Sequence, residues 1–204
     1  GFQFLCQRTQ LNFGGILADD MGLGKTLQAL AWLVWLKRAR TDPKSPFRVL
    51  VVCPKSVMDN WLSEPEKFKT RLSSARHHGK PDALQAKALE KANIVVANYT
   101  QLRTHADTFT ARNWDAVILD EAQYIKNPAS QTARVACQLE TPHRLVLTGT
   151  PIENRSLDLW SLLRFAMPGA LGSQAQFKRL YNEKKDPQAL PRLARRIQPF
   201  LLRR

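Results

Sequence analysis

Short apolar runs alternate with longer segments of mixed polarity along residues 15–147. The runs are rich in Val, Ile and Leu, and each is short enough to be a strand buried on both faces of a parallel sheet. They lie at residues 15–18, 48–53, 93–99, 116–119 and 144–147, with a weaker candidate at 76–77. The segments between them predict helices at 27–36, 57–69, 82–91 and 129–139. This alternation predicts an α/β fold with a mostly parallel sheet, helices on both faces, and function at the carboxyl ends of the strands.

The alternation ends near Asn154, and beyond that residue we expect no further strand. Two or three helices are predicted within residues 156–198. The Pro168-Gly169 pair is a typical turn sequence, so we place a domain boundary there. The predicted organisation is an α/β domain at 1–167 and a basic helical appendage at 168–204, with no internal repeat.

The composition is that of an ordinary folded protein, because 44% of the 204 residues are hydrophobic and 24% are charged. The longest apolar run, at 27–36, is too short to span a membrane, and the N-terminus does not resemble a signal peptide. Cys6, Cys53 and Cys137 lie far apart, and His77-His78 has no partner at metal-ligand spacing. We therefore expect reduced thiols, no membrane partner and an intracellular protein.

The chain is strongly basic, because 31 Lys and Arg residues outnumber 17 Asp and Glu residues and leave a net charge of +14. Half of this excess lies in residues 173–204, which contain nine basic and two acidic residues. Such a balance predicts attraction to a polyanion, with nucleic acid as the first candidate. The alternative is a solvated helical face that lies beside an acidic partner domain.

A phosphate-binding loop is predicted at residues 19–26, which read Asp-Asp-Met-Gly-Leu-Gly-Lys-Thr after the first apolar run. Gly22 and Gly24 allow the backbone to turn so that successive N–H groups face an anion. Lys25 could then reach the outer phosphates of a nucleotide, and the Thr26 hydroxyl could bind Mg²⁺ at the start of a helix. The predicted nucleotide contacts are Asp20, Met21, Gly22, Leu23, Gly24, Lys25, Thr26 and Leu27.

This loop departs from the general pattern, which has glycine six residues before the lysine, where this chain has Asp19. Taken alone, the segment could equally be a glycine-rich turn between a strand and a helix, with an exposed lysine. Other segments of the chain must therefore decide between the two interpretations.

A carboxylate at the end of another central strand would complete a Mg²⁺ site beside a phosphate loop. Asp120 follows the apolar run 116–119 and is placed to hold Mg²⁺, while Glu121 could accept a proton from an attacking water. The alternative for this pair is an acidic start of a helix. Because the phosphate loop precedes the pair in an alternating α/β pattern, we favour the interpretation of Asp120 as a metal ligand and Glu121 as a base.

Thr148, Gly149 and Thr150 follow the apolar run 144–147 in the same way. Hydroxyls beside a flexible glycine could sense whether a triphosphate is intact and couple that state to a bound nucleic-acid strand. Thr-Gly-Thr-Pro is also an ordinary turn sequence, so this segment is not specific by itself.

Six segments occur in a fixed order that spans nearly the whole chain. They are Gly14–Thr26, Val52–Ser56 with Asn60-Trp61, Asn98–Thr100, Asp120–Gln123 with Lys126-Asn127, Leu147–Asn154 and Pro199–Arg204. Together they resemble the first motor lobe of superfamily-two helicase-like ATPases, and more closely the Swi/Snf family of double-stranded-DNA translocases. Asp19 is part of that family's own pattern, so its place in the loop supports the resemblance.

The resemblance implies a RecA-like P-loop NTPase lobe that binds ATP and Mg²⁺. It implies that Lys25, Glu121 and Gln123 are catalytic residues, and that Thr26 and Asp120 hold the metal. Gln123 stands where related helicases often carry His, and it would couple the nucleotide site to the Thr-Gly-Thr segment.

The resemblance also implies contacts along one DNA strand, made mainly with phosphates and therefore independent of base sequence. These contacts would come from Pro54, Lys55, Ser56, Tyr99, Thr100 and Gln101. Without the resemblance, Lys55 is better explained as a solvated helix start, and Tyr99 as a core residue at the end of a strand.

Members of this family have two RecA-like lobes with ATP between them, so the resemblance implies a second lobe beyond Arg204 and duplex DNA as a partner. Arginines of the second lobe stabilise the transferred phosphoryl group, so we expect these 204 residues alone to bind nucleotide weakly and to hydrolyse it negligibly. The glutamine that reads adenine in the family would precede Gly1. RNA polymerase or another DNA-bound protein is a candidate partner, and the expected location is the nucleoid-containing cytoplasm of a bacterium or a eukaryotic nucleus.

Two other classes of protein stay open at this point. One is a metabolic P-loop kinase or GTPase, although the chain has no guanine-reading Asn-Lys-x-Asp. The other is a basic nucleic-acid-binding module whose nucleotide site is vestigial.

Overall fold

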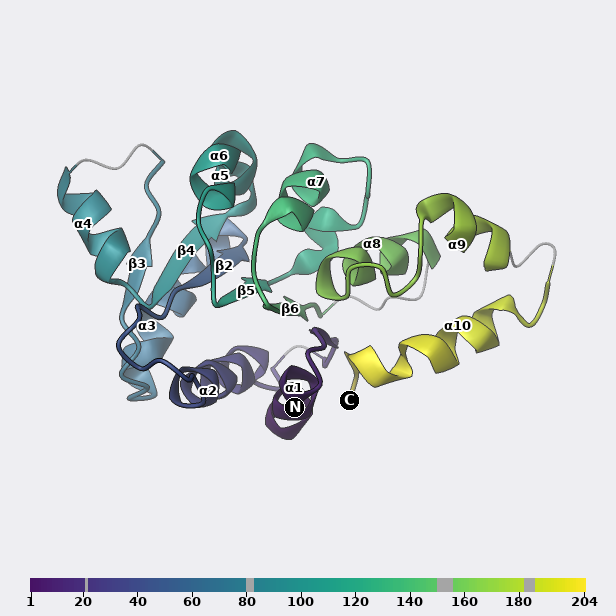
Figure 1. Cartoon of the computed structure of the whole chain (residues 1–204), viewed down its shortest axis with the longest axis horizontal. Helices are drawn as coiled ribbons and strands as arrows, with labels where there is room; N and C mark the ends of the chain where they lie inside the picture. Colours follow the sequence, from purple (N-terminus) through teal and green to yellow (C-terminus); the bar gives the residue numbers. More distant parts are fainter. Residues whose placement is uncertain (21, 80–82, 150–155, 182–185) are drawn as a thin grey trace.

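A seven-stranded parallel sheet forms the centre of the computed structural model, which describes residues 1–20, 22–79, 83–149, 156–181 and 186–204. The strands lie in the order β3-β4-β2-β5-β6-β1-β7, and each neighbouring pair is parallel (Figure 1). They are β1 (Gly15–Leu17), β2 (Val49–Cys53), β3 (Ser74–Arg76), β4 (Ile94–Asn98), β5 (Ala116–Leu119), β6 (His143–Leu147) and β7 (Leu201–Leu202). The predicted α/β class with a parallel sheet is confirmed.

Helices cover both faces of the sheet (Figure 1). One layer contains α1 (Phe2–Gln10), α2 (Lys25–Arg38) and α3 (Met58–Lys67). The other contains α5 (Tyr99–Thr104), α6 (Ala106–Thr110), α7 (Gln131–Gln138) and α8 (Ser156–Ala166), while α4 (Ala83–Lys91) lies beside β3. The two layers explain why the strands read as continuous apolar runs and not as alternating ones.

Strand β2 shows how one apolar run fills two cores. All five of its residues are completely buried. Leu50 and Val52 pack with the helices of the α5–α8 layer, whereas Val49 and Val51 pack with those of the α1–α3 layer. Successive side chains of a strand point to opposite faces, so a central strand needs apolar residues at every position.

Strand β4 ends one residue earlier than the sequence predicted. Tyr99 is the first residue of α5, because the side chain of Asn98 caps that helix. The Gln101 N–H donates to Asn98 Oδ1, and the Asn98 N–H donates to Gln101 Oε1, each at 2.9 Å. Such a reciprocal cap satisfies two backbone donors that a helix start would otherwise leave unpaired. Helix α5 was not predicted, and neither were α1 and α6.

The expectation that no strand follows Asn154 is wrong. After α9 (Gln174–Leu180) and α10 (Ala189–Ile197), the short 3₁₀ helix η3 (Gln198–Phe200) leads into β7. Strand β7 adds to the edge of the sheet by pairing Leu201 and Leu202 with Ile16 and Leu17 of β1. A two-residue strand has too little pattern to be read from sequence, because its pairing depends on a distant segment.

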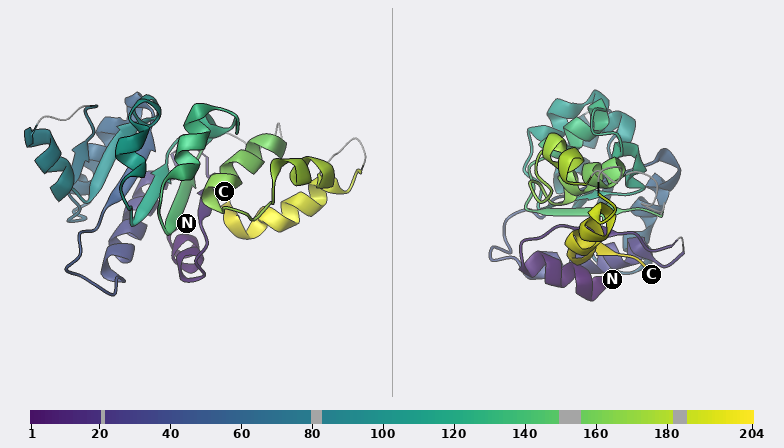
Figure 2. Two further views of the ribbon diagram at one scale, coloured as in Figure 1. Left: turned by 45° about the horizontal axis from the view of Figure 1, so that its top comes forward. Right: turned by 90° about the vertical axis from the view of Figure 1, so that its right-hand side faces the viewer.

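Helices α9 and α10 extend beyond the edge of the sheet, as the left view of Figure 2 shows with α10 in yellow. Phe177, Leu193 and Ile197 nevertheless pack in the same apolar cluster as Trp160 and Phe165. The chain then returns to the sheet through β7. The domain boundary between residues 167 and 168 stays a prediction. Three helices occupy the described part of 156–198, within the predicted two or three.

Some expectations fall on residues outside the described part of the chain. These are most of the turn at 79–81, the first residue of the helix at 82–91, and the charged residues Glu183, Lys184 and Lys185. Among the described residues, the helices are all too short or too polar to cross a bilayer.

Candidate nucleotide-binding site

The phosphate loop and the Asp120-Glu121 pair line one open cavity of about 430 Å³ at the carboxyl ends of the strands. The loop follows β1, and the acidic pair follows β5. The lining residues are Gly22, Gly24, Lys25, Thr26, Leu27, Val57, Asn60, Trp61, Glu64, Phe68, Asp120 and Glu121. The structure therefore brings together the two signals that the sequence separates by almost a hundred positions.

The loop has the backbone conformation that its glycines predict. Gly22 has φ of 87° and Gly24 has φ of 68°, both in the left-handed region that favours glycine. A Cβ atom built on Gly22 would meet nothing within 4 Å, so the space above the loop is open. Helix α2 begins directly after Gly24, at Lys25. A helix start with free N–H groups beside an open turn can accept an anion such as a phosphate.

Lys25 rests on the backbone of its own loop. Its Nζ donates to the carbonyl oxygens of Asp19 at 2.7 Å and Asp20 at 3.1 Å. Both acceptors are neutral, so no carboxylate neutralises the ammonium through these contacts. The charge is therefore available to a phosphate that enters the cavity.

Asp120 is held firmly at the end of β5. Its Oδ2 accepts a hydrogen bond of 2.8 Å from Trp61 Nε1, and its Oδ1 accepts one of 2.9 Å from the Glu121 N–H. Burial raises the pKa of the Asp120 carboxyl above its ordinary value, while the Trp61 hydrogen bond opposes the rise and the charge of Glu121 adds to it. The charge of Lys25, which lines the same cavity, also opposes the rise in pKa. Mg²⁺ bound to this buried carboxylate would further relieve the cost of its burial.

Glu121 has an unusual backbone, with φ of 50° and ψ of 53°. This left-handed conformation costs a non-glycine residue about 1–2 kcal/mol. The residue is half-buried and lines the same cavity as Lys25 and Thr26. The backbone strain is thus located at the residue that the sequence assigns as the base.

The structure describes two of the three predicted coupling residues, Thr148 and Gly149. Thr148 is buried at the end of β6, and its N–H donates to the carbonyl of Leu17 in β1 at 3.0 Å. Gly149 follows it, while Met21 and Thr150 lie outside the described residues. The buried Oε1 of Gln123 has no hydrogen-bond partner among the residues described. The coupling role of these residues stays a prediction.

The residues predicted to contact DNA lie beyond β2 and β4. Lys55 and Ser56 are exposed in the 3₁₀ helix η1 (Lys55–Val57), directly after Pro54. Thr100 is exposed at the start of α5, and Gln101 follows it. Lys55 and Gln101 line one cavity of about 360 Å³, whose other lining residues are Met58, Arg76, His77, His78 and Asn98. Arg76 and His78 add basic groups there that the sequence analysis did not assign.

Tyr99 differs from the other predicted DNA contacts because its side chain is buried. Its hydroxyl donates to the carbonyl oxygen of Asp120 at 2.8 Å. Its ring stacks on that of Tyr124, with 4.7 Å between the centroids and 8° between the planes. This side chain therefore supports the strand end that carries Asp120.

Several lining residues of the nucleotide cavity were missed. Trp61 and Glu64 lie on α3, and burial raises the pKa of the Glu64 carboxyl. Trp61 belongs to one of the ordered segments of the resemblance, but it was not assigned to this site. The other sequence signal was the helical spacing of Met58, Trp61 and Pro65, the residues that α3 buries. That spacing predicts a buried face but does not indicate which site it borders.

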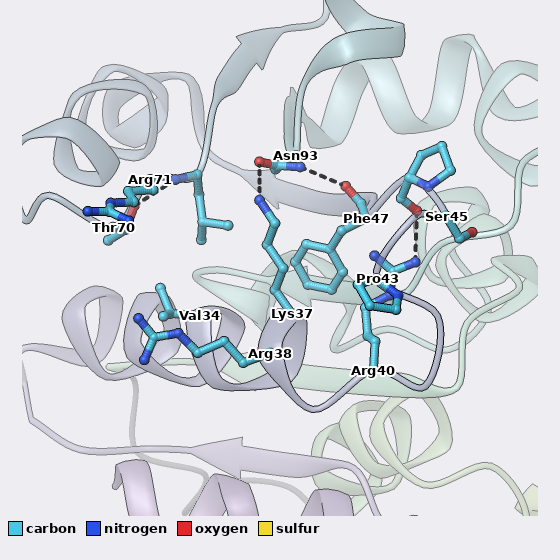
Figure 3. A pocket seen from close by; sticks show the side chains of 12 residues that line it. Val34, Lys37, Arg38, Arg40, Pro43, Ser45, Phe47, Thr70, Arg71 and Asn93 are labelled. Carbon is cyan, nitrogen blue, oxygen red and sulfur yellow. Dashed lines mark hydrogen bonds between the residues drawn. The ribbon is translucent and has the colours of Figure 1, made fainter.

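A third cavity, of about 470 Å³, lies at the amino ends of β2 and β4 (Figure 3). Lys37 Nζ donates to Asn93 Oδ1 there at 3.0 Å, and Asn93 Nδ2 donates to the carbonyl of Phe47 at 3.2 Å. The cavity is basic, with Arg38, Arg40 and Arg71 also in its lining. It lacks a glycine turn at a helix start, so the chemistry of a triphosphate site belongs to the cavity beside Lys25.

Comparison with known proteins agrees with this geometry. The family model described as the SNF2-related domain matches residues 1–204. The TATA-binding protein-associated factor BTAF1 of Arabidopsis thaliana is 35% identical over 226 residues, which cover 100% of this chain and 11% of that protein. The human SWI/SNF-related matrix-associated actin-dependent regulator of chromatin, subfamily A member 1, is 34% identical over 212 residues. That match covers 100% of this chain and 20% of the human protein.

The same relationship appears among solved structures. The Sulfolobus solfataricus SWI2/SNF2 ATPase core in complex with dsDNA superposes with a TM-score of 0.88 at 38% identity, and covers 100% of this chain and 42% of that chain. This chain thus spans less than half the length of these relatives. The resemblance inferred from the ordered sequence segments is confirmed over the full chain. The chain belongs to the SNF2-related domain family.

Proposed function

We propose that this chain is the ATP-binding lobe of a DNA-dependent ATPase, which couples ATP hydrolysis to movement along duplex DNA and to remodelling of protein–DNA complexes. The observation that carries the proposal is the single cavity that contains Lys25, Thr26, Asp120 and Glu121. These are a phosphate-binding cation, two oxygen ligands suited to Mg²⁺, and a carboxylate that can accept a proton.

The residues present fit ATP with Mg²⁺. The open space over Gly22, the start of α2 and the ammonium of Lys25 favour a polyphosphate. The Thr26 hydroxyl and the Asp120 carboxylate are hard oxygen donors, which Mg²⁺ prefers, and the metal would neutralise charge on the phosphates when bound. Adenine selectivity rests on the family alone.

Each residue then has a distinct task in hydrolysis. Lys25 would leave the carbonyls of Asp19 and Asp20 and bind the outer phosphates. Asp120 would bind Mg²⁺, with its two oxygens held in position by hydrogen bonds from Trp61 and the Glu121 N–H. Glu121 would take a proton from the attacking water, and Gln123 would connect the site to the Thr148 segment.

Binding to duplex DNA is supported by the net charge of +14 and by the cavity that Lys55 and Gln101 share. The Sulfolobus relative was solved in complex with dsDNA, which favours the same ligand for this chain. Contacts with phosphates would make the affinity fall steeply with salt and leave it insensitive to base sequence.

A second RecA-like lobe of the same polypeptide would complete the site, since this chain covers 42% of the ATPase core that it resembles. Arginine residues that approach the transferred phosphoryl group contribute several orders of magnitude in rate. We therefore expect negligible hydrolysis by these residues alone, and robust DNA-stimulated turnover by the isolated chain would contradict this.

The test is the ATPase rate of the full-length protein with and without duplex DNA. Stimulation by DNA, without transfer of phosphate to another acceptor, would support the proposal. Transfer to a small-molecule acceptor would indicate a metabolic kinase instead. DNA binding that does not change with ATP, together with no hydrolysis, would indicate a nucleic-acid-binding module with a vestigial site.

A further inference from the structure

Arg204 contacts both ends of the phosphate loop. Its guanidinium donates to the carboxylate of Asp19, from Nε at 3.3 Å and from NH2 at 2.6 Å. The same NH2 group donates to Gln28 Oε1 at 3.0 Å, in the first turn of α2. The backbone takes part as well, because the Asp20 N–H donates to the Arg204 carbonyl at 3.2 Å. One residue thus joins the start of the loop to the helix after it.

Strand β7 delivers Arg204 to this position. It is the edge strand next to β1, and it pairs through only two residues, Leu201 and Leu202. The Ala18 N–H extends the pairing by donating to the Leu202 carbonyl at 2.7 Å. A strand this short contributes few hydrogen bonds of its own, so the contacts of Arg204 are a large part of what attaches the segment 201–204 to the loop.

Asp19 is the centre of these contacts. Its side chain is completely buried, and the charge of a buried carboxylate needs a partner. Burial alone would raise the pKa of Asp19, but the hydrogen bonds and charge of Arg204, with help from Gln28, lower it below its ordinary value. The carbonyl of the same Asp19 accepts from Lys25 Nζ, so the residue that Arg204 fixes is the residue on which Lys25 rests.

Gln28 extends the arrangement to the other side of the loop. Its Oε1 accepts from Arg204, and its Nε2 donates to the Leu23 carbonyl at 2.7 Å. Leu23 lies between the two glycines whose left-handed turns shape the loop. Removing Arg204 would therefore free the carboxylate of Asp19 and would also remove one of the two hydrogen bonds that hold the Gln28 amide, whose other bond is to Leu23.

We propose that Arg204 is a positioning residue for nucleotide binding, which holds the phosphate loop in the shape that receives phosphates. This inference rests on the proposed ATP-binding function. It also links the segment 201–204 to the nucleotide site, so that a displacement of β7 changes nucleotide affinity and bound nucleotide resists that displacement. Such coupling is reciprocal by thermodynamic necessity.

The test is the affinity of the full-length protein for a fluorescent ATP analogue with Mg²⁺, measured beside the melting temperature and the saturated ATPase rate. We expect Arg204→Ala to weaken nucleotide binding about tenfold, with the rate at saturating ATP within about twofold of the wild type. Arg204→Lys should recover part of the affinity, because lysine can still pair with Asp19. Asp19→Asn combined with Arg204→Ala should weaken binding no more than the stronger single change, because the two residues act as a pair.

Arg8→Ala is the matched control. Arg8 NH1 donates to the Pro199 carbonyl at 2.9 Å, so this arginine attaches the same C-terminal segment without touching the phosphate loop. We expect Arg8→Ala to lower the melting temperature and to leave nucleotide affinity within twofold. Equal affinity in Arg204→Ala and Arg8→Ala, whatever their melting temperatures, would overturn the positioning role. Failure of the wild type to bind the analogue would instead overturn the proposed function on which it rests.

Discussion

Trp61 donates a buried hydrogen bond to Asp120 across the nucleotide cavity, from Nε1 to Oδ2 at 2.8 Å. Trp61 is completely buried in α3, and Asp120 follows β5 with only 9% of its surface exposed. The indole therefore fixes one oxygen of the carboxylate that we assign to Mg²⁺. The bond also lowers the pKa of Asp120 against the rise that burial causes.

Replacing Trp61 by Phe should make nucleotide binding more sensitive to acid. The change removes the donor, so the pKa of Asp120 should rise further and protons should compete with Mg²⁺ at higher pH. Loss of a hydrogen bond to a charged group should also cost about 1.5–3 kcal/mol of stability. The measurement is the affinity for Mg²⁺–nucleotide as a function of pH, with unfolding in denaturant as the second readout.

Trp114→Phe is the control for that experiment. Trp114 is a buried tryptophan whose Nε1 donates to the Phe109 carbonyl at 2.9 Å, away from the nucleotide cavity. It should lower stability by about 1 kcal/mol and leave the pH profile of nucleotide binding unchanged. If both variants shift that profile equally, Trp61 acts only through packing.

Glu121→Gln and Lys25→Ala should separate chemistry from binding. Gln keeps the size of the side chain and the same backbone cost at φ of 50°, but it cannot accept the proton. In Glu121→Gln, hydrolysis should therefore fall at least about 100-fold, while nucleotide affinity stays within a few-fold of the wild type. Lys25→Ala removes the cation that contacts the loop carbonyls, so affinity should fall at least about tenfold. Single-turnover hydrolysis and equilibrium binding distinguish the two, and a binding defect in Glu121→Gln would argue against its role as base.

Lys55→Ala should weaken binding to duplex DNA at all sequences alike. Lys55 is exposed and lines the cavity that follows β2, where its charge can reach a phosphate. Loss of one phosphate contact should reduce the slope of log affinity against log salt by about 0.9. Lys87→Ala, which removes an exposed lysine from α4, should leave the slope unchanged. An unaltered slope in Lys55→Ala would favour its interpretation as a solvated helix start.

Tyr99→Phe should leave DNA affinity within twofold of the wild type. The hydroxyl of Tyr99 is already used by the Asp120 carbonyl, and its ring is stacked on Tyr124. Removing the hydroxyl should instead cost about 1 kcal/mol of stability, because a buried carbonyl loses its donor. Salt-dependent DNA binding checks the first expectation and denaturant unfolding the second. A loss of DNA affinity as large as that of Lys55→Ala would support the original prediction that Tyr99 contacts DNA.

The strands and the loop were predictable because their causes are local. Strand β2 and its neighbours are buried on both faces, and that condition appears in the sequence as an uninterrupted apolar run. The loop could be recognised because a tight turn before a helix requires glycine at Gly22 and Gly24. Each of these features depends on a few consecutive residues.

The contacts that organise the site could not be predicted, because they join distant segments. Trp61 and Asp120 are 59 positions apart, and Asp19 and Arg204 are 185 positions apart. Helix α1 was missed because only Leu5 and Thr9 of its nine residues are buried, so its apolar pattern is weak. Strand β7 exists only where β1 offers it an edge. A single sequence carries no record of which segments meet.

His77→Phe should reduce the loss in free energy of unfolding that occurs as the pH falls. His77 is 1% exposed, its Nε2 has no hydrogen-bond partner in the described part of the chain, and its ring packs on Phe109 at 4.7 Å and His105 at 5.5 Å. Burial, followed by the charges of His105, Arg112 and His78, lowers the pKa of His77 from 6.5 to about 4.

The folded state therefore takes up this proton later than the unfolded state as pH falls. Above pH 6.5 the group has no effect on stability, and between pH 6.5 and 4 it should remove about 3 kcal/mol in total. Phe fits an aromatic cluster and does not titrate, so the variant should match the wild type near pH 7 and exceed it by about 2 kcal/mol near pH 4.5. Denaturant unfolding of both proteins at several pH values checks this. A parallel decline of His77→Phe and the wild type would place the acid sensitivity in other groups.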